Sequence, residues 1–312
     1  MSRITARAPV RIDFGGGWTD VPPYPEEQGG YVTSVAITRY VTATAEPDPR
    51  AHPDGDEPAI ISAARRVVPS LRAHIALHSD VPIGSGLGGS SAASVALLAA
   101  LTAADGRKLV GTTLAETSRR FEVHELGIAG GWQDHYAAAL GGALAMEFTR
   151  TNRVVRLPLA EHAAQELESS MLLYFTGASR LSADTIDAVK AGYLRHDPGT
   201  RAALRDMERL ARAMAEPLVT GDVAHLGSLV GEHWLHQRAL HSAITTPLLD
   251  TMITTALRAG AFGAKALGAS GGGCMIVLAP VERVPAIAAL LDPLATRLSF
   301  AVDRIGCAVR ST

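Results

Sequence analysis

Residues suited to phosphate chemistry gather in the first third of the chain. Residues 82–92, PIGSGLGGSSA, follow a predicted strand and open a predicted helix. The backbone N–H groups of such a loop and the dipole of the helix attract anions, and phosphate is the natural guest. Ser90 and Ser91 at the helix start suit phosphate oxygens and Mg²⁺. The segment therefore predicts a phosphate-binding loop.

Three other interpretations of this loop are weaker. Gly84, Gly86 and Gly89 satisfy the GxGxxG pattern, but the residues after Asp105 indicate a helix, not the second strand with a terminal acid that a dinucleotide site needs. The pattern of the P-loop nucleotidases fails because no lysine follows the last glycine. A turn with an N-capping serine explains one serine and one glycine, not four glycines.

The amino-acid composition of the chain limits the kinds of partner that it can bind. The chain has 312 residues, 47% of them hydrophobic, and a formal net charge of −2. This balance predicts a globular protein and gives no basic field for nucleic acid or anionic lipid, so a local site must hold any anionic ligand. Cys274 and Cys307 are the only cysteines, which favours a reducing compartment. The N-terminus lacks a secretory signal, and the longest apolar tract, 92–104, is too short to span a bilayer. We expect a cytoplasmic protein.

The elements that must position the loop alternate between strands and helices. The first half is rich in predicted strands and the second half in helices, with glycine-rich loops at strand ends. Strands are predicted at 3–14, 31–46, 74–80, 171–176 and 299–305, and on either side of the glycine-rich turn at 268–273. Helices are predicted over 92–104, 114–126, 135–140 and 284–298, and over most of 181–260 with breaks at 197–199, Pro217 and Pro247.

Three loops together resemble the motifs of the GHMP kinase superfamily. They are APVRIDFGGGWTDVPP at 8–23, PIGSGLGGSSAAS at 82–94 and KALGASGGGCMIV at 265–277. Within the superfamily they resemble the branch of D-glycero-D-manno-heptose 7-phosphate kinases and L-fucokinases, because GGGWTD replaces GEHTD and GGWQDHYAAALGG resembles the GWQDQ element. YFTGASRLSADTI, LVGEHWLHQRAL and ITTPLLD resemble the heptose kinases in particular.

The resemblance implies a two-lobed α/β (α+β) fold with a left-handed βαβ unit and an active site in the cleft between lobes 1–165 and 166–312. It implies an ATP- and Mg²⁺-dependent kinase that phosphorylates the anomeric C1 hydroxyl of a sugar. A heptose 7-phosphate is the first choice, and L-fucose or another free sugar is the second. A regulatory protein that has lost catalysis is the third reading, and the presence of Asp134, Glu122 and Ser90 argues against it. The sequence leaves open whether the protein is a monomer or a homodimer.

Asp134 matches the family's catalytic aspartate, where a carboxylate can accept the proton of a sugar hydroxyl. Its alternative role is the N-cap of the helix at 135–140. Glu122 matches the Mg²⁺-binding acid, with Ser90 as the hydroxyl ligand. Glu125, one turn away, is an alternative to Glu122, and Ser91 is an alternative to Ser90.

The first loop resembles the substrate-binding segment of sugar kinases. Arg11 is a catalytic and substrate-binding candidate, or it forms a structural ion pair with Asp13 or another acid. Gly17, Thr19 and Asp20 are further substrate-binding candidates, since a carboxylate accepts two vicinal hydroxyls and glycine permits close approach. Trp18 could stack on a sugar or pack under the loop.

The resemblance also assigns the nucleotide site. The third loop, 268–273, would add N–H donors behind the triphosphate. The residues expected at ATP are Gly84, Ser85, Gly86, Leu87, Gly88, Gly89, Ser90, Ser91, Gly271 and Gly272.

Arg180 follows a strand and could meet a substrate phosphate or form a surface ion pair. His135 stands where relatives commonly carry glutamine. His233, His236 and His241 lack the spacing and the acid of a zinc protease, so we expect no metal there.

Overall fold

A computed structural model describes residues 2–51, 57–128, 130–177 and 182–312, without the side chains of 182–184. The first of its two sheets has six strands in the order β10-β1-β2-β4-β5, with β3 also paired to β2, and all of its pairs are antiparallel. The strands are β1 (Ile4–Gly15), β2 (Gly30–Pro47), β3 (Ala73–Ser79), β4 (Ala143–Phe148), β5 (Arg153–Leu157) and β10 (Ala308–Ser311). The end of the chain therefore returns to the strand on which it begins.

The second sheet is smaller and is built from the second half of the chain. Its order is β7-β8-β6-β9, and its pairs are antiparallel. The strands are β6 (Met171–Phe175), β7 (Gly263–Ala266), β8 (Cys274–Leu278) and β9 (Thr296–Arg297). The predicted strand at 171–176 and the strand, glycine turn and strand around 268–273 are confirmed.

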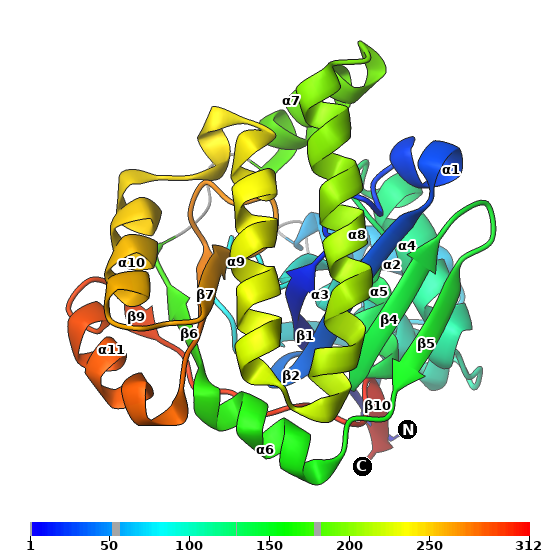
Figure 1. The fold of residues 1–312 in the computed structure, drawn as a ribbon. Coiled ribbons are helices and arrows are strands. Elements are labelled where there is room, and N and C mark those ends of the chain that lie inside the picture. Colours follow the sequence, from blue (N-terminus) through cyan, green and yellow to red (C-terminus); the bar gives the residue numbers. More distant parts are fainter. Residues whose placement is uncertain (1, 52–56, 129, 178–181) are drawn as a thin grey trace.

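Helices cover both sheets. Helices α8 and α9 stand side by side in front of the first sheet, whereas α3 and α5 lie behind β1 (Figure 1). Helix α9 also contacts β7, which joins the two sheets. The helices are α1 (Tyr24–Gln28), α2 (Ala59–Val67), α3 (Gly89–Ala104), α4 (Gly111–Glu125), α5 (Gln133–Leu140), α6 (Glu161–Ser170), α7 (Ser182–Leu194), α8 (Pro198–Thr220), α9 (Val223–Ala239), α10 (Pro247–Arg258) and α11 (Val284–Leu291).

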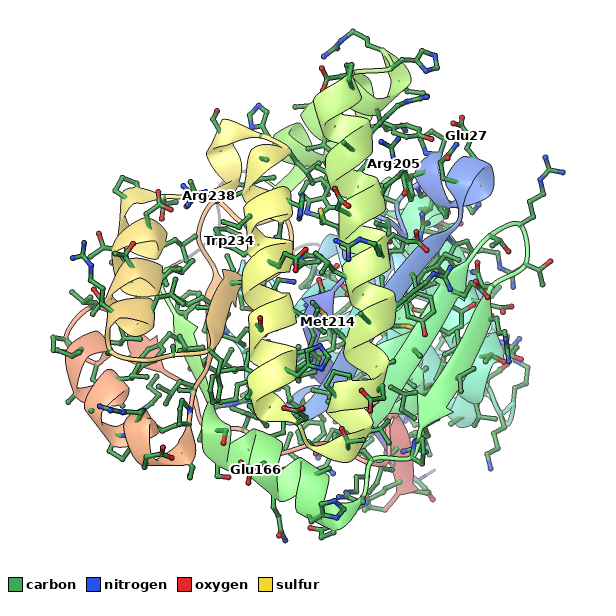
Figure 2. The ribbon with its side chains drawn as sticks, viewed as in Figure 1. Glu27, Glu166, Arg205, Met214, Trp234 and Arg238 are labelled. Carbon is green, nitrogen blue, oxygen red and sulfur yellow. The ribbon has the colours of Figure 1, made fainter. Side chains whose placement is uncertain are left out.

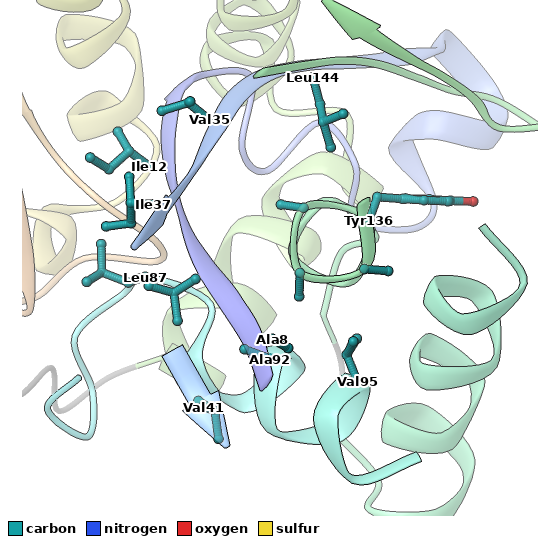
Figure 3. Close-up of a cluster of buried hydrophobic side chains, with 14 of the residues drawn as sticks. Ala8, Ile12, Val35, Ile37, Val41, Leu87, Ala92, Val95, Tyr136 and Leu144 are labelled. Carbon is teal, nitrogen blue, oxygen red and sulfur yellow. The ribbon is translucent and has the colours of Figure 1, made fainter. Parts of the chain in front are cut away.

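The largest core lies between the first sheet and its helices. From Ala8 onward, side chains on both faces of β1 are buried, because helices cover both faces of the sheet. Helix α3 is apolar on nearly all sides, which suits a helix packed among β1, β2, α4 and α5. Figure 3 shows part of this core, with Tyr136 and Val95 projecting from helices and Ile12 and Val35 from strands. The predicted buried helix at 92–104 is confirmed.

Three local predictions are wrong. Helix α8 continues through Pro217 to Thr220, because packing of the helix, including buried Pro217 itself, outweighs the lost hydrogen bond. The predicted helix 284–298 ends at Leu291, because Pro293 has no N–H group with which to continue the helical hydrogen bonds. The predicted strand 299–305 makes a single bridge between Val302 and Ile37.

The last strand instead follows a turn. The Asp303 carboxylate accepts hydrogen bonds from the N–H groups of Ile305 and Gly306, and strand β10 begins two residues later, at Ala308.

In the part of the chain that the structure describes, the helices are too short or too polar to cross a bilayer. The division at residue 165 stays a prediction. The largest hydrophobic cluster runs across that position, since it joins β1 and α3 to residues of α8, α9 and β8.

Candidate active site

Arg11 joins the candidate catalytic carboxylate to the glycine loop. Its Nε donates to Asp134 Oδ1 at 2.7 Å, and its Nη1 donates to the carbonyl of Gly86 at 2.6 Å. Arg11 lies on β1 and is buried, whereas the Asp134 side chain is 26% exposed. Arg11 therefore forms an ion pair with Asp134 and not with Asp13, and it fixes the carboxylate beside the predicted phosphate loop.

Asp134 lies in the first turn of α5, which begins at Gln133, two residues before the predicted start. Its carboxylate bonds Arg11, so it is not the N-cap of its own helix. Asp20 takes that role from the first loop. Its Oδ2 accepts from the N–H groups of Trp132 at 2.7 Å and of Gln133 at 3.0 Å. Asp20 thereby holds the end of α5 that carries Asp134.

The environment of Asp20 is crowded and acidic. Burial, helped by the neighbouring carboxylates of Asp134 and Asp13, raises the pKa of Asp20 to about 6, although the two backbone hydrogen bonds oppose the shift. A Cβ at Gly131 would overlap Asp20 Oδ2. Glycine at 131 is therefore what allows this carboxylate to reach the helix end.

Each glycine of the triplet in the first loop is required by a different neighbour. A Cβ at Gly15 would lie 2.6 Å from the sulfur of Met214, which projects from α8 (Figure 2). At Gly16, which has φ of +91°, it would overlap the carbonyl of Tyr31. At Gly17 it would overlap Asp13 Oδ2. The close approach of this backbone to a substrate stays a prediction.

Two buried side chains, one from β7 and one from α9, form hydrogen bonds with the backbone of the first loop. Lys265 Nζ, on β7, donates to the carbonyl of Asp13 at 3.0 Å and lies 3.4 Å from Asp13 Oδ2. Burial lowers the pKa of Lys265, and Asp13 partly opposes this shift. His233 Nε2, on α9, accepts from the N–H of Gly16 at 2.8 Å. Burial, and then the charge of Lys265, keep the pKa of His233 well below 6.5, so the ring remains a neutral acceptor.

Lys265 is not among the site residues predicted from sequence, and Asp13 is predicted only as a possible partner of Arg11. The available signal was a lone lysine in an apolar strand.

The three histidines of α9 and its end have separate environments. His236 faces Asp206 at 3.8 Å, and His241 accepts from the N–H of Ala243.

A pocket of about 130 Å³ lies between these groups. Five of the seven predicted substrate residues line it: Arg11, Gly17, Trp18, Asp20 and Asp134. Trp18 has φ of +85°, a conformation that side chains rarely adopt away from functional loops. The structure thus gathers these residues around one cavity, and their contact with a substrate stays a prediction.

Thr19, another predicted substrate residue, is not among the described residues that line this pocket. The hydroxyl of Thr19 donates to the carbonyl of Gly16 and accepts from the N–H of Tyr31, so it closes the first loop against β2. Arg180 lies outside the described residues.

The predicted phosphate loop ends in a helix terminus without a side-chain cap. Gly88 is the N-cap of α3 and has left-handed backbone, and no side chain bonds the first N–H groups of this helix. The first four N–H groups of a helix have no partner within it, so they are available to an anion. A Cβ at Gly88 would lie 3.0 Å from the carboxyl carbon of Asp134. The helix terminus and the candidate base are therefore adjacent.

The third loop packs backbone to backbone against the second. A Cβ at Gly86 would lie 2.6 Å from the carbonyl of Leu267, and the N–H of Cys274 donates to the carbonyl of Ser85 at 2.7 Å. Gln237 of α9 braces the third loop, because its Nε2 donates to the carbonyl of Gly268 and to the hydroxyl of Ser270. The N–H of Gly271 is engaged by the carbonyl of Ile244, so a contact of this group with phosphate stays a prediction.

The Glu122 carboxylate accepts hydrogen bonds from serine hydroxyls at the start of α3. Its Oε1 accepts from Ser90 at 2.6 Å and its Oε2 from Ser91 at 3.1 Å. His135 Nε2 lies 3.0 Å from Oε2, and because a carboxylate only accepts, this nitrogen carries the hydrogen. Burial alone would raise the pKa of Glu122, but the bonds from His135 and the two serines outweigh it, and the pKa lies below its ordinary value.

The two glutamates that the sequence left open now differ. Glu125 is half exposed and bonds Arg66 at 3.0 Å, away from the serines. Within the described residues, no group of three or more metal-ligating side chains occurs. Mg²⁺ in phosphoryl-transfer sites commonly takes one or two carboxylates, with waters and phosphate oxygens completing its shell. Glu122 with Ser90 at the uncapped helix fits that kind of site.

Comparison with known families decides the identity. The model of the GHMP kinases N terminal domain matches residues 59–142, and the model of the GHMP kinases C terminal domain matches residues 201–292. The D-glycero-alpha-D-manno-heptose 7-phosphate kinase of Campylobacter jejuni is 30% identical over 93% of this chain and 94% of its own. The chain belongs to the GHMP kinase family. The resemblance inferred from the three loops is therefore confirmed, and so is the mixed α/β kinase fold.

Other relatives of this GHMP kinase carry related names. The bifunctional fucokinase/GDP-fucose pyrophosphorylase of Arabidopsis thaliana is 26% identical, and the match covers 89% of this chain but 30% of that protein. A solved structure named as a D-glycero-D-manno-heptose 1-phosphate kinase from Bacteroides thetaiotaomicron has a TM-score of 0.80 and 25% identity over 98% of both chains. The names of the two heptose kinases differ in the position of the phosphate.

Proposed function

We propose that this protein is an ATP-dependent kinase that phosphorylates the anomeric hydroxyl of a heptose phosphate, with a heptose 7-phosphate as the first choice. The observation that carries the proposal is the position of Asp134, which lies at the pocket lined by five of the predicted substrate residues and next to the uncapped start of α3. A nucleophile in the pocket and a phosphate on the helix terminus would meet at this carboxylate. The names of the heptose kinase relatives support the choice of sugar.

The reaction follows from these positions. The anomeric oxygen forms a bond to the γ-phosphorus of ATP, the bond from that phosphorus to the β-bridging oxygen breaks, and ADP leaves. Asp134 accepts the hydroxyl proton. Arg11 keeps the carboxylate oriented through Oδ1, and its bond to the carbonyl of Gly86 keeps the loop in register with it. Positioning of this kind supplies much of the rate in phosphoryl transfer.

The nucleotide phosphates would lie on the N–H groups at the start of α3. Glu122 and the hydroxyl of Ser90 would hold Mg²⁺, which would neutralise charge on the phosphates. Before it binds, the hydrogen bonds from Ser90, Ser91 and His135 keep the Glu122 carboxylate oriented and charged.

ADP release with a panel of sugars tests the proposal. The panel contains heptose 7-phosphate, L-fucose, galactose and mannose, each with ATP and Mg²⁺ and each repeated in excess EDTA. We expect turnover with the heptose phosphate that exceeds turnover with every free sugar and that stops in EDTA. Preferred turnover of L-fucose would support the free-sugar alternative, and equal turnover in EDTA would contradict the metal requirement.

A further inference from the structure

Asp13 and Lys265 form the most deeply buried ion pair at the pocket. The Lys265 side chain has no exposed surface and that of Asp13 is 4% exposed. Lys265 comes from the second sheet, and Asp13 lies on β1, two residues after Arg11 and on the same side of the strand. A buried pair is weak evidence for stability, because removing two charges from water offsets their attraction. Lys265 also lies in the field of Arg11, which disfavours a second cation.

The pair leaves one oxygen without a partner. Lys265 engages the Oδ2 side of the carboxylate, whereas Asp13 Oδ1 is buried and has no hydrogen-bond partner among the described residues. Gln133 Oε1 is in the same condition, and both residues line the pocket. Gly17 also lines the pocket and lies directly against both side chains, because a Cβ there would overlap Asp13 Oδ2 and lie 3.0 Å from Gln133 Nε2. The pocket wall therefore presents residues with unsatisfied acceptors, which a polyhydroxylated ligand would satisfy.

We propose that Asp13 binds a hydroxyl of the sugar and that Lys265 is the positioning residue that holds the Asp13 side chain in place. This inference rests on the proposed function for its ligand. Asp134 and Arg11 act at the transferred proton, so the Asp13 pair contributes to recognition of the sugar rather than to proton transfer. The pair explains why a lysine is retained in an apolar strand beside a second cation.

Neutralising both partners separates recognition from stability. Lys265→Met alone leaves a buried carboxylate without its counter-charge, so the melting temperature should fall. Lys265→Met/Asp13→Asn removes both charges at nearly constant volume and should recover most of that loss. The matched control, Arg65→Met/Glu57→Gln, neutralises another largely buried pair, whose Nη2 to Oε1 distance is 2.7 Å and whose residues do not line this pocket.

Binding and turnover are measured separately. Binding of D-glycero-D-manno-heptose 7-phosphate and of ATP is followed by calorimetry, and ADP release gives kcat and KM. In the double variant we expect the sugar Kd and KM to rise about ten- to a hundredfold, the typical effect of a lost charge-assisted hydrogen bond. The ATP Kd and the kcat at saturating sugar should stay within a few-fold of wild type. The control should keep the wild-type sugar Kd.

The outcomes distinguish the two proposals. A double variant that recovers stability and also binds the sugar as wild type does would overturn the role of Asp13. So would a wild type that binds no sugar of the panel, or a variant that loses kcat at unchanged sugar Kd. A wild type that binds the heptose phosphate without releasing ADP would contradict the kinase proposal. The role of Asp13 would then be decided by comparing the sugar Kd of the wild type with that of the double variant. If the double variant does not fold, Asp13→Asn alone carries the same comparison.

Discussion

Asp134 and Arg11 are 123 positions apart in the chain and share a hydrogen bond of 2.7 Å from Nε to Oδ1. The same guanidinium donates to the carbonyl of Gly86 in the phosphate loop. One side chain thus ties the candidate base, the first strand and the second glycine loop together.

The first prediction concerns Asp134. Asp134→Asn keeps the size of the side chain and removes the proton acceptor, so kcat should fall by about 10²–10⁴-fold. Because the variant leaves the buried guanidinium of Arg11 without its counter-charge, the melting temperature should also fall. ATP affinity, measured by calorimetry, should remain close to wild type. A folded variant with near-normal kcat would assign proton removal to another group.

Glu122 and Glu125 provide a matched pair for the second prediction. Glu122→Gln removes a charged oxygen at the hydroxyls of Ser90 and Ser91, so the KM for Mg·ATP should rise about ten- to a hundredfold. Glu125→Gln, one turn along the same helix and bonded to Arg66, should leave that KM unchanged. The change in KM is measured by following activity while Mg²⁺ is titrated at fixed ATP. The opposite ranking would place the metal site at Glu125.

Neighbouring glycines give the third prediction. A Cβ at Gly131 would overlap Asp20 Oδ2, whereas one at Gly130 would meet nothing within 4 Å. Gly131→Ala should therefore destabilise the protein by about 1–3 kcal/mol and lower kcat, because it displaces the group that holds α5. Gly130→Ala should be close to neutral. Urea unfolding and ADP release measure both effects, and equal behaviour of the two variants would contradict the role of Asp20 at the helix end.

The fourth prediction uses the pKa of Asp20. That pKa is about 6 in the folded protein against 3.8 for an ordinary aspartate, so the folded chain binds the proton more tightly. The resulting stability is fully present below about pH 4 and is lost as the pH rises through 6, with a slope of up to about 1.4 kcal/mol per pH unit.

Asp20→Asn lacks this titration. The difference in unfolding free energy between wild type and variant should therefore shift in favour of the variant from pH 4 to pH 7. Urea unfolding at several pH values measures it. A difference that is constant across this range would contradict the raised pKa.

Much of this site follows from local sequence, and its long-range contacts do not. The glycine triplet predicts close backbone approach and the loop at 82–92 predicts an anion site, because those properties depend on few neighbouring residues. The partner of Arg11 could not be chosen, since Asp13 is near in sequence and Asp134 is near only after folding. Asp20 shows the same limit: its helix-end role requires the position of Trp132, 112 residues away.

The predicted elements failed where tertiary packing decides. Pro217 marks a helix end by local rules, but burial of α8 against the sheet outweighs that preference. Lys265 gave only the signal of a lone charge in an apolar strand, and its partner belongs to the other end of the chain.

The most direct test of the account is the identity of the product. Wild-type protein is incubated with ATP, Mg²⁺ and D-glycero-D-manno-heptose 7-phosphate, and phosphorus and proton NMR locate the new phosphate ester. The account predicts a sugar 1,7-bisphosphate, with coupling between the new phosphorus and the anomeric proton, and little product from Asp134→Asn in the same time. A new ester at any other carbon, or ATP hydrolysis to inorganic phosphate with the sugar unchanged, would contradict it.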